Sequence, residues 1–106
     1  MSFNLTKEFP ALAVELGELL QRGGEDELAT IIDELAVVDR CRCGDDFCAT
    51  MYTAPRPNGA WGEAHRNVAL DPERGYLILD VLNERIVAVE VLYRDEIRRS
   101  LLTLMP

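Results

Sequence analysis

Three cysteines lie within eight residues of one another and form the densest chemical motif of the chain. The segment 41–48 reads Cys-Arg-Cys-Gly-Asp-Asp-Phe-Cys. Residues two apart on a strand point to the same face, so Cys41 and Cys43 would share one face. A turn at 44–47 would then bring Cys48 across from Cys43. The spacing predicts that three thiols converge on one side of a β-hairpin.

Three interpretations of this cluster are open. The pattern favours small buried side chains of the core with no cofactor, which is a common role of free cysteine. The alternative is a zinc site made by Cys41, Cys43, Cys48 and the only histidine, His65, although same-face residues on a regular strand lie farther apart than sulfurs around one zinc ion. A Cys43–Cys48 disulfide or redox pair comes third, because a reducing compartment and an odd cysteine count disfavour it.

The sequence contains little that matches a known catalytic motif. The chain has no glycine-rich phosphate loop, no Gly-x-Ser-x-Gly elbow and no second histidine. A nucleophilic pair of one cysteine with His65 lacks any supporting signature. Asp80 and Glu90 lie in apolar strand segments, where a carboxyl group more often marks an edge or a salt bridge than an acid with a shifted pKa. The sequence therefore favours a non-enzymatic protein.

A long loop over residues 54–65 is the candidate contact surface. It contains two prolines, an Asn-Gly pair and a tryptophan among small residues, and ordered loops of this length tend to bind something. Trp61 would be the anchor, with Arg56, His65 and Arg66 as polar contacts. The equal alternative is a tryptophan that folds back over the open end of the sheet.

The hydrophobic pattern predicts one α+β domain over residues 1–106. Its period is helical before residue 37 and strand-like after it. The first predicted element is a helical hairpin, in which one helix runs from a cap at Thr6 to Gly23-Gly24 and the second covers 25–36. A five-stranded antiparallel meander follows, with strands at 37–43, 47–53, 66–70, 76–81 and 86–93. The chain is expected to end in a helix that is capped by Asp95 and buries Ile97 and Leu101.

The last predicted hairpin bears on assembly. A two-residue turn at Asn83-Glu84 would pair Val81 with Ile86 and Leu77 with Glu90. Both faces of this hairpin would then be mostly apolar, which predicts that both are covered. The cover would come from the helices or from a second copy of the chain, so a homodimer is expected as often as not.

Charge narrows the classes of partner. The 106 residues carry a net charge of −8, and residues 1–39 hold nine acidic but only two basic side chains. Such a chain should be repelled by nucleic acids and by anionic membranes. The apolar runs are too short to cross a bilayer and no signal-peptide pattern opens the chain, so a cytoplasmic location is expected. The leading hypothesis is a regulatory module that binds a protein or itself, similar by analogy to immunity or inhibitor proteins.

Two sequence blocks carry a resemblance. The motif Cys-x-Cys-Gly-x-x-x-Cys-x-x-x-Tyr-Thr at 41–53 resembles small bacterial proteins of unknown function. The last third, with Arg-Ile-Val-Ala-Val-Glu-Val-Leu at 85–92, is similar to a bacterial domain of unknown function in which a short meander ends in such a strand before a helix. The resemblance implies a strand-rich second half, and it brings no activity and no functional residue.

Overall fold

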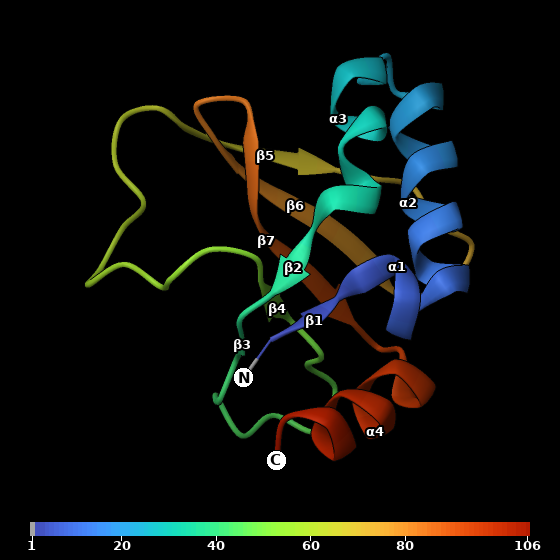
Figure 1. Cartoon of the computed structure of the whole chain (residues 1–106), viewed down its shortest axis with the longest axis vertical. Helices are drawn as coiled ribbons and strands as arrows, with labels where there is room; N and C mark the ends of the chain where they lie inside the picture. The colour runs from blue at the N-terminus through green and yellow to red at the C-terminus, as the bar shows by residue number, and fades with distance from the viewer. Residues whose placement is uncertain (1) are drawn as a thin grey trace.

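A five-stranded antiparallel sheet forms the centre of the computed structural model, which describes residues 2–106 (Figure 1). In spatial order its strands are β3 (Asp39–Arg40), β4 (Met51–Tyr52), β7 (Arg85–Leu92), β6 (Tyr76–Leu82) and β5 (His65–Ala69). A separate antiparallel pair consists of β1 (Phe3–Asn4) and β2 (Ala36–Val37). The helices are α1 (Leu5–Glu8), α2 (Pro10–Arg22), α3 (Asp26–Thr30), the 3-10 turn η1 (Ile32–Glu34) and α4 (Asp95–Leu104). The predicted α+β class is confirmed.

The first predicted helix is divided in two. Phe9 leaves the helical conformation (φ −130°, ψ 64°), because the ring of Pro10 disfavours helical geometry in the residue before it. The proline then occupies the first position of α2, where a missing N–H costs little. Asn4, and not Thr6, caps α1, since its side chain accepts a hydrogen bond from a backbone N–H of the first turn at 2.9 Å. The predicted cap was therefore wrong by two residues.

The second predicted helix, 25–36, is shorter than expected. The link before it forms as predicted, with Gly24 at φ +77°. The helix then ends at Thr30, whose hydroxyl donates a hydrogen bond of 2.7 Å to the Glu27 carbonyl and so competes with the helical pattern. The chain continues as η1 and enters β2. The hairpin of helices is nevertheless formed, and α2 packs along α3 (Figure 1).

The predicted strands 37–43 and 47–53 are mostly loop. In each of these two segments only two residues take part in the ladder between them, and they form β3 and β4. β4 then pairs with β7 and not with its successor in the chain, which departs from a simple meander. This pairing places Met51 opposite Val89, and both side chains are fully buried. Burial of apolar surface therefore selects the order of the strands.

The turn between β6 and β7 is the one that the sequence predicts. Asn83 and Glu84 have positive φ angles of 52° and 60°, as a two-residue type I′ turn requires. Val81 pairs with Ile86, also as predicted.

Beyond this turn the register of the hairpin shifts by one residue. A β-bulge interrupts the ladder between Asp80 and Val81, so one residue of β7 has no partner. Leu77 consequently pairs with Val91, and Glu90 pairs with Ile78 on the opposite face. The prediction that Glu90 shares a face with Leu77 was wrong, because a bulge leaves no clear trace in an apolar sequence.

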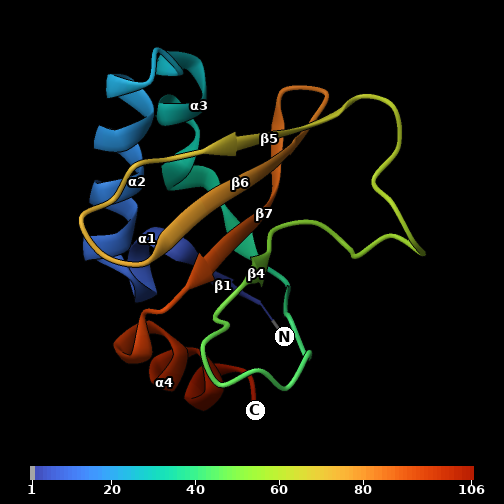
Figure 2. The same cartoon turned by 180° about the vertical axis from the view of Figure 1, so that it is seen from behind.

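The helices α2 and α3 cover one face of the sheet, while the loop between β4 and β5 lies on the other side (Figures 1 and 2). We call this second side the open face. It carries Thr50 and Tyr52 at β4, Glu90 on β7, Asp80 on β6 and His65 on β5. Helices therefore do not cover both faces, and cover by a second copy stays a prediction.

The C-terminal helix α4 lies at the end of the sheet where β7 finishes (Figure 2). It buries Ile97 and Leu101 against the common core, as predicted. The predicted cap at Asp95 was wrong, because Asp95 is the first residue of the helix, Arg94 occupies the cap position and no side chain caps the helix. The core cluster reaches from Leu5 to Met105. No helix among residues 2–106 combines the length and the apolar character needed to cross a lipid bilayer.

Candidate functional site

The three cysteines converge. Their Sγ atoms all lie within 4.8 Å of one another, and none is in a disulfide. Cys41 and Cys48 are half-buried and Cys43 is exposed. The predicted convergence is confirmed, but the favoured interpretation as buried core side chains was wrong, because none of the three belongs to the core.

Different parts of the chain position each thiol. Cys41 extends the ladder beyond β3, since its N–H donates a hydrogen bond of 2.9 Å to the Thr50 carbonyl. Cys48 forms an isolated bridge to the end of β7. Between them the chain leaves the sheet and turns at Gly44, where φ is +84°. The predicted strand through Cys43 is absent, so a folded loop and not a regular hairpin brings this thiol back to the other two.

The thiols influence each other's acidity. Burial acts to raise the pKa of Cys48, but hydrogen bonds with Thr50 and with the other two cysteines outweigh it and lower this pKa. At Cys43 a bond from the Asp45 backbone acts to lower the pKa, whereas desolvation and contacts with Cys41 and Cys48 raise it to about 11. Between these two thiols, a thiolate is therefore favoured at Cys48 over Cys43.

A cavity of about 30 Å³ lies among the cysteines. All three line it, together with Arg40 and Arg98. This is room for one water-sized particle. The arrangement can therefore hold a single ion between sulfur atoms.

His65 lies apart from the cysteine cluster. It is the first residue of β5, and its Nε2 is 2.8 Å from Oδ1 of Asp80. The side chain of Asn67 donates a hydrogen bond of 2.7 Å to the same oxygen. The structure thus brings three of the four predicted zinc ligands together and gives the fourth a different partner. Sequence reasoning missed this group, although His65 and Asn67 alternate along one strand and so share a face.

Asp80 and Glu90 form an acidic pair on the open face. Asp80 is only 6% exposed. Burial, followed by a hydrogen bond with Asp80 and the charge of Asp80, raises the pKa of Glu90 to about 7. Neither carboxyl group forms a salt bridge with an arginine or lysine in the described part of the chain. Asp80 instead forms its ion pair with His65, as the salt-bridge interpretation expects, and the less favoured interpretation, a carboxyl group with a shifted pKa, applies to Glu90.

Replacing Glu90 by Gln should alter how stability depends on pH in the metal-free protein. The folded pKa of Glu90, about 7, lies above its ordinary value of 4.5. Its contribution to stability is then fully present below pH 4.5 and is lost as pH rises through 7. At pH 8, Glu90→Gln should raise the free energy of unfolding by about 1–2 kcal/mol, a value reduced for the partial exposure of the side chain. At pH 4.5 the two proteins should differ little.

Urea unfolding at pH 4.5 and pH 8 measures this difference. Glu63→Gln, at an exposed position of the loop, is the matched control and should leave both values unchanged. An equal stability of wild type and Glu90→Gln at pH 8 would contradict the expectation.

The predicted contact surface is only partly assembled. The ring of Trp61 lies 6.5 Å from that of Tyr52 and 6.4 Å from that of His65, so the tryptophan folds back over the open face. The Arg56 guanidinium lies 5.4 Å from the Tyr52 ring centroid. Arg66 is directed away from this group, toward Glu25, with which it forms two hydrogen bonds. Three of the four predicted contact residues therefore share a surface.

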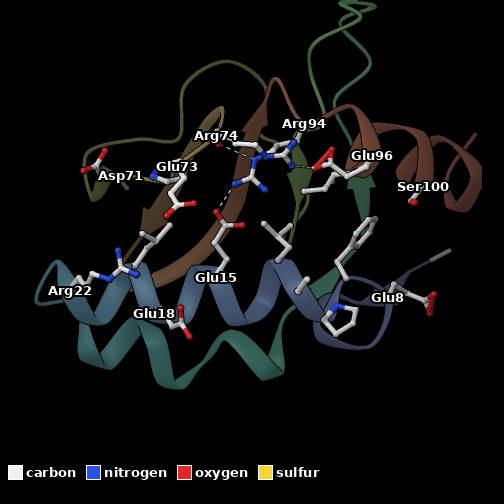
Figure 3. A pocket seen from close by; sticks show the side chains of 17 residues that line it. Glu8, Glu15, Glu18, Arg22, Asp71, Glu73, Arg74, Arg94, Glu96 and Ser100 are labelled. Atoms are coloured by element: carbon white, nitrogen blue, oxygen red, sulfur yellow. Dashed lines mark hydrogen bonds and ion pairs between the residues drawn. The ribbon is translucent and has the colours of Figure 1, made fainter.

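A groove away from the open face was not predicted from the sequence. It has a volume of about 720 Å³ and lies between α2, α4 and the loop after β5 (Figure 3). The buried side chain of Arg94 spans it, with hydrogen bonds to the Glu15 carboxylate and to the Arg74 carbonyl. Ion pairs within the groove therefore join its walls. A protein partner for this or any other surface stays a prediction.

Comparison of the chain with family models, with curated proteins and with solved structures finds no match. The resemblance to bacterial proteins, stated from the motif at 41–53, therefore stays a prediction. Any functional conclusion has to come from the geometry of the chain itself.

Proposed function

We propose that the protein is a metal-binding module that holds one Zn²⁺ ion on Cys41, Cys43 and Cys48. One observation carries the proposal, namely that the three Sγ atoms lie within 4.8 Å of one another without a disulfide. Sulfurs around a tetrahedral zinc ion are about 3.8 Å apart. An inward movement of about 1 Å would complete the site, and the exposed Cys43 lies in the loop that can make it.

The donor set favours a thiophilic ion. Three thiolates select zinc or Cu(I) over magnesium and calcium, which prefer oxygen ligands. The cavity of about 30 Å³ among the cysteines offers space for the ion. Arg40 and Arg98 beside it offset part of the negative charge that three thiolates and one divalent cation leave on the site.

The test is a metal titration of the full chain with reduced thiols. We expect one Zn²⁺ per chain in competition with a chromophoric chelator, and intense sulfur-to-metal charge-transfer absorption when Co²⁺ replaces zinc. A triple variant, Cys41→Ser with Cys43→Ser and Cys48→Ser, should bind neither ion. Less than half an equivalent of Zn²⁺ bound by folded wild type would refute the proposal.

A second variant separates this ligand set from the one predicted by sequence. His65 is hydrogen-bonded to Asp80 and is not part of the cysteine cluster. His65→Ala should therefore keep full zinc stoichiometry and an affinity within about threefold of wild type, since only a distant interaction changes. A loss of about 100-fold or more would identify His65 as a ligand and require β5 to move.

A further inference from the structure

The cysteine cluster stands between two cavities. The smaller, of about 30 Å³, is lined by all three thiols. Cys41 and Cys48 also line a second cavity of about 320 Å³, whose other walls include Tyr52, Trp61, Asp80 and Glu90 on the open face. The first has room for an ion, whereas the second reaches the lower end of the sizes that hold small molecules. An ion held by the thiols would therefore border a space that can admit a ligand.

Three thiolates supply only three of the four bonds of a tetrahedral zinc ion. In the part of the chain that the structure describes, no other histidine, cysteine or carboxylate group joins the cluster at ligand distance. Three acids line the larger cavity, Asp45, Asp80 and Glu90. Asp80 accepts hydrogen bonds from His65 and Asn67 and interacts with Glu90, and the carboxylate of Asp45 is not part of the cysteine cluster. One coordination position is thus left for a donor from outside the chain, as in zinc sites that exchange ligands.

The charge of the larger cavity restricts which donor can enter. Asp80 and Glu90 are among its lining residues, and no lysine or arginine is. A zinc ion with three thiolates adds a further net negative charge. An anionic ligand is repelled, while a ligand with a positive group gains from the carboxyl groups and from the faces of Tyr52 and Trp61.

The same charge disfavours hydrolytic chemistry. A water bound to zinc becomes a strong nucleophile when the ion is positive enough to lower its pKa. Three thiolates and neighbouring carboxyl groups oppose the formation of hydroxide, a further anion, at the site. A soft ion in this donor set instead favours a further sulfur ligand.

We propose that the fourth coordination position takes a small aminothiol, whose sulfur binds the ion while its ammonium group lies beside Asp80 and Glu90. This inference rests on the proposed metal site. In the binding step the thiol releases its proton to solvent, a sulfur–metal bond forms and the bound water leaves, with no oxidation or reduction. The ammonium group balances the charge that the new thiolate brings.

The test uses the Co²⁺-loaded full chain under anaerobic conditions and three thiols of similar size. Cysteamine carries a positive group, 2-mercaptoethanol is neutral and mercaptoacetate is negative. Visible absorption of Co²⁺ reports the entry of a fourth sulfur, and affinities are corrected for the ionisation of each thiol. At pH 8 we expect cysteamine to bind at least about tenfold more tightly than mercaptoacetate, with 2-mercaptoethanol between them.

Variants connect this preference to the cavity. Glu90→Gln should reduce the ratio of cysteamine to mercaptoacetate affinity to about threefold or less, whereas Glu63→Gln should leave it unchanged. Asp80→Asn provides a second carboxyl change of equal size if the first variant misfolds. A wild type that binds Co²⁺ but does not respond to any thiol, or responds equally to all three, overturns the inference and leaves the metal site standing. Absence of Co²⁺ binding overturns both.

Discussion

Replacement of Cys48 by Ser should weaken zinc binding by about 100- to 1,000-fold, because it removes one of three thiolate bonds to the ion. The sheet positions Cys48 through its bridge to the end of β7. Its pKa is also lowered by hydrogen bonds with Thr50. Cys48 is therefore more ready than Cys43 to bind a cation as a thiolate.

A ligand that binds only the folded protein also stabilises it. At a free zinc concentration 100 times Kd, the wild type should gain about 2.7 kcal/mol in the free energy of unfolding. Cys48→Ser should lose nearly all of this gain at the same zinc concentration. Chelator competition and thermal unfolding with and without zinc measure the two effects.

The exposed thiol offers the matched comparison. Cys43 lies in the loop outside the ladder, so water or a neighbouring group can approach its place in a variant. Cys43→Ser should therefore lose less affinity than Cys48→Ser, by about tenfold, within the range of ligand and near-ligand changes. Equal zinc affinity in wild type and Cys48→Ser would show that the sulfurs do not hold the ion. Circular dichroism of the metal-free variants verifies that loss of binding is not loss of fold.

The largest effect on stability should come from Arg94→Ala, with a loss of about 2–4 kcal/mol. Arg94 is 6% exposed and connects three elements. Its guanidinium donates hydrogen bonds to Glu15 on α2 and to the Arg74 carbonyl in the loop before β6 (Figure 3). Its backbone carbonyl accepts a hydrogen bond from the Arg98 N–H in the first turn of α4. Removal of the side chain leaves the Glu15 carboxylate without its partner and opens a void under α4.

Urea unfolding measures this loss, with two comparison variants. Arg99→Ala changes an exposed arginine of α4 and should shift stability by no more than about 0.5 kcal/mol. Arg94→Lys keeps the charge but loses the forked geometry that reaches two acceptors, so it should restore less than half of the loss. A loss no larger than that of Arg99→Ala would show that the buried ion pair does not hold α4 to α2.

The elements of the fold follow from local pattern, and their arrangement does not. Helical spacing in α2 and α4 and the Asn83-Glu84 turn were all predicted, because each depends on residues close in sequence. The pairing of β4 with β7 was not, because it depends on burial of Met51 against a strand more than thirty residues away. Such contacts are selected by the whole core and not by any segment.

The candidate site shows the same division. The spacing of the cysteines was enough to predict that they converge, although a loop and not a strand accomplishes it. The partner of His65 could not be predicted, because β5 begins one residue earlier than the pattern indicates. That one residue places His65 on the sheet beside Asp80, and not in the loop.

The unpaired residue in β7 gives this strand one residue more than an even ladder requires. Val87 is the additional residue in the count from the turn to Glu90. Deleting it would restore an even ladder and leave each later pair, from Ala88 with Asp80 to Leu92 with Tyr76, on its present face. An inserted residue beside a bulge that stays single would instead place Glu90 opposite Leu77, in the apolar interior. The strand is therefore more tolerant of losing this residue than of gaining another.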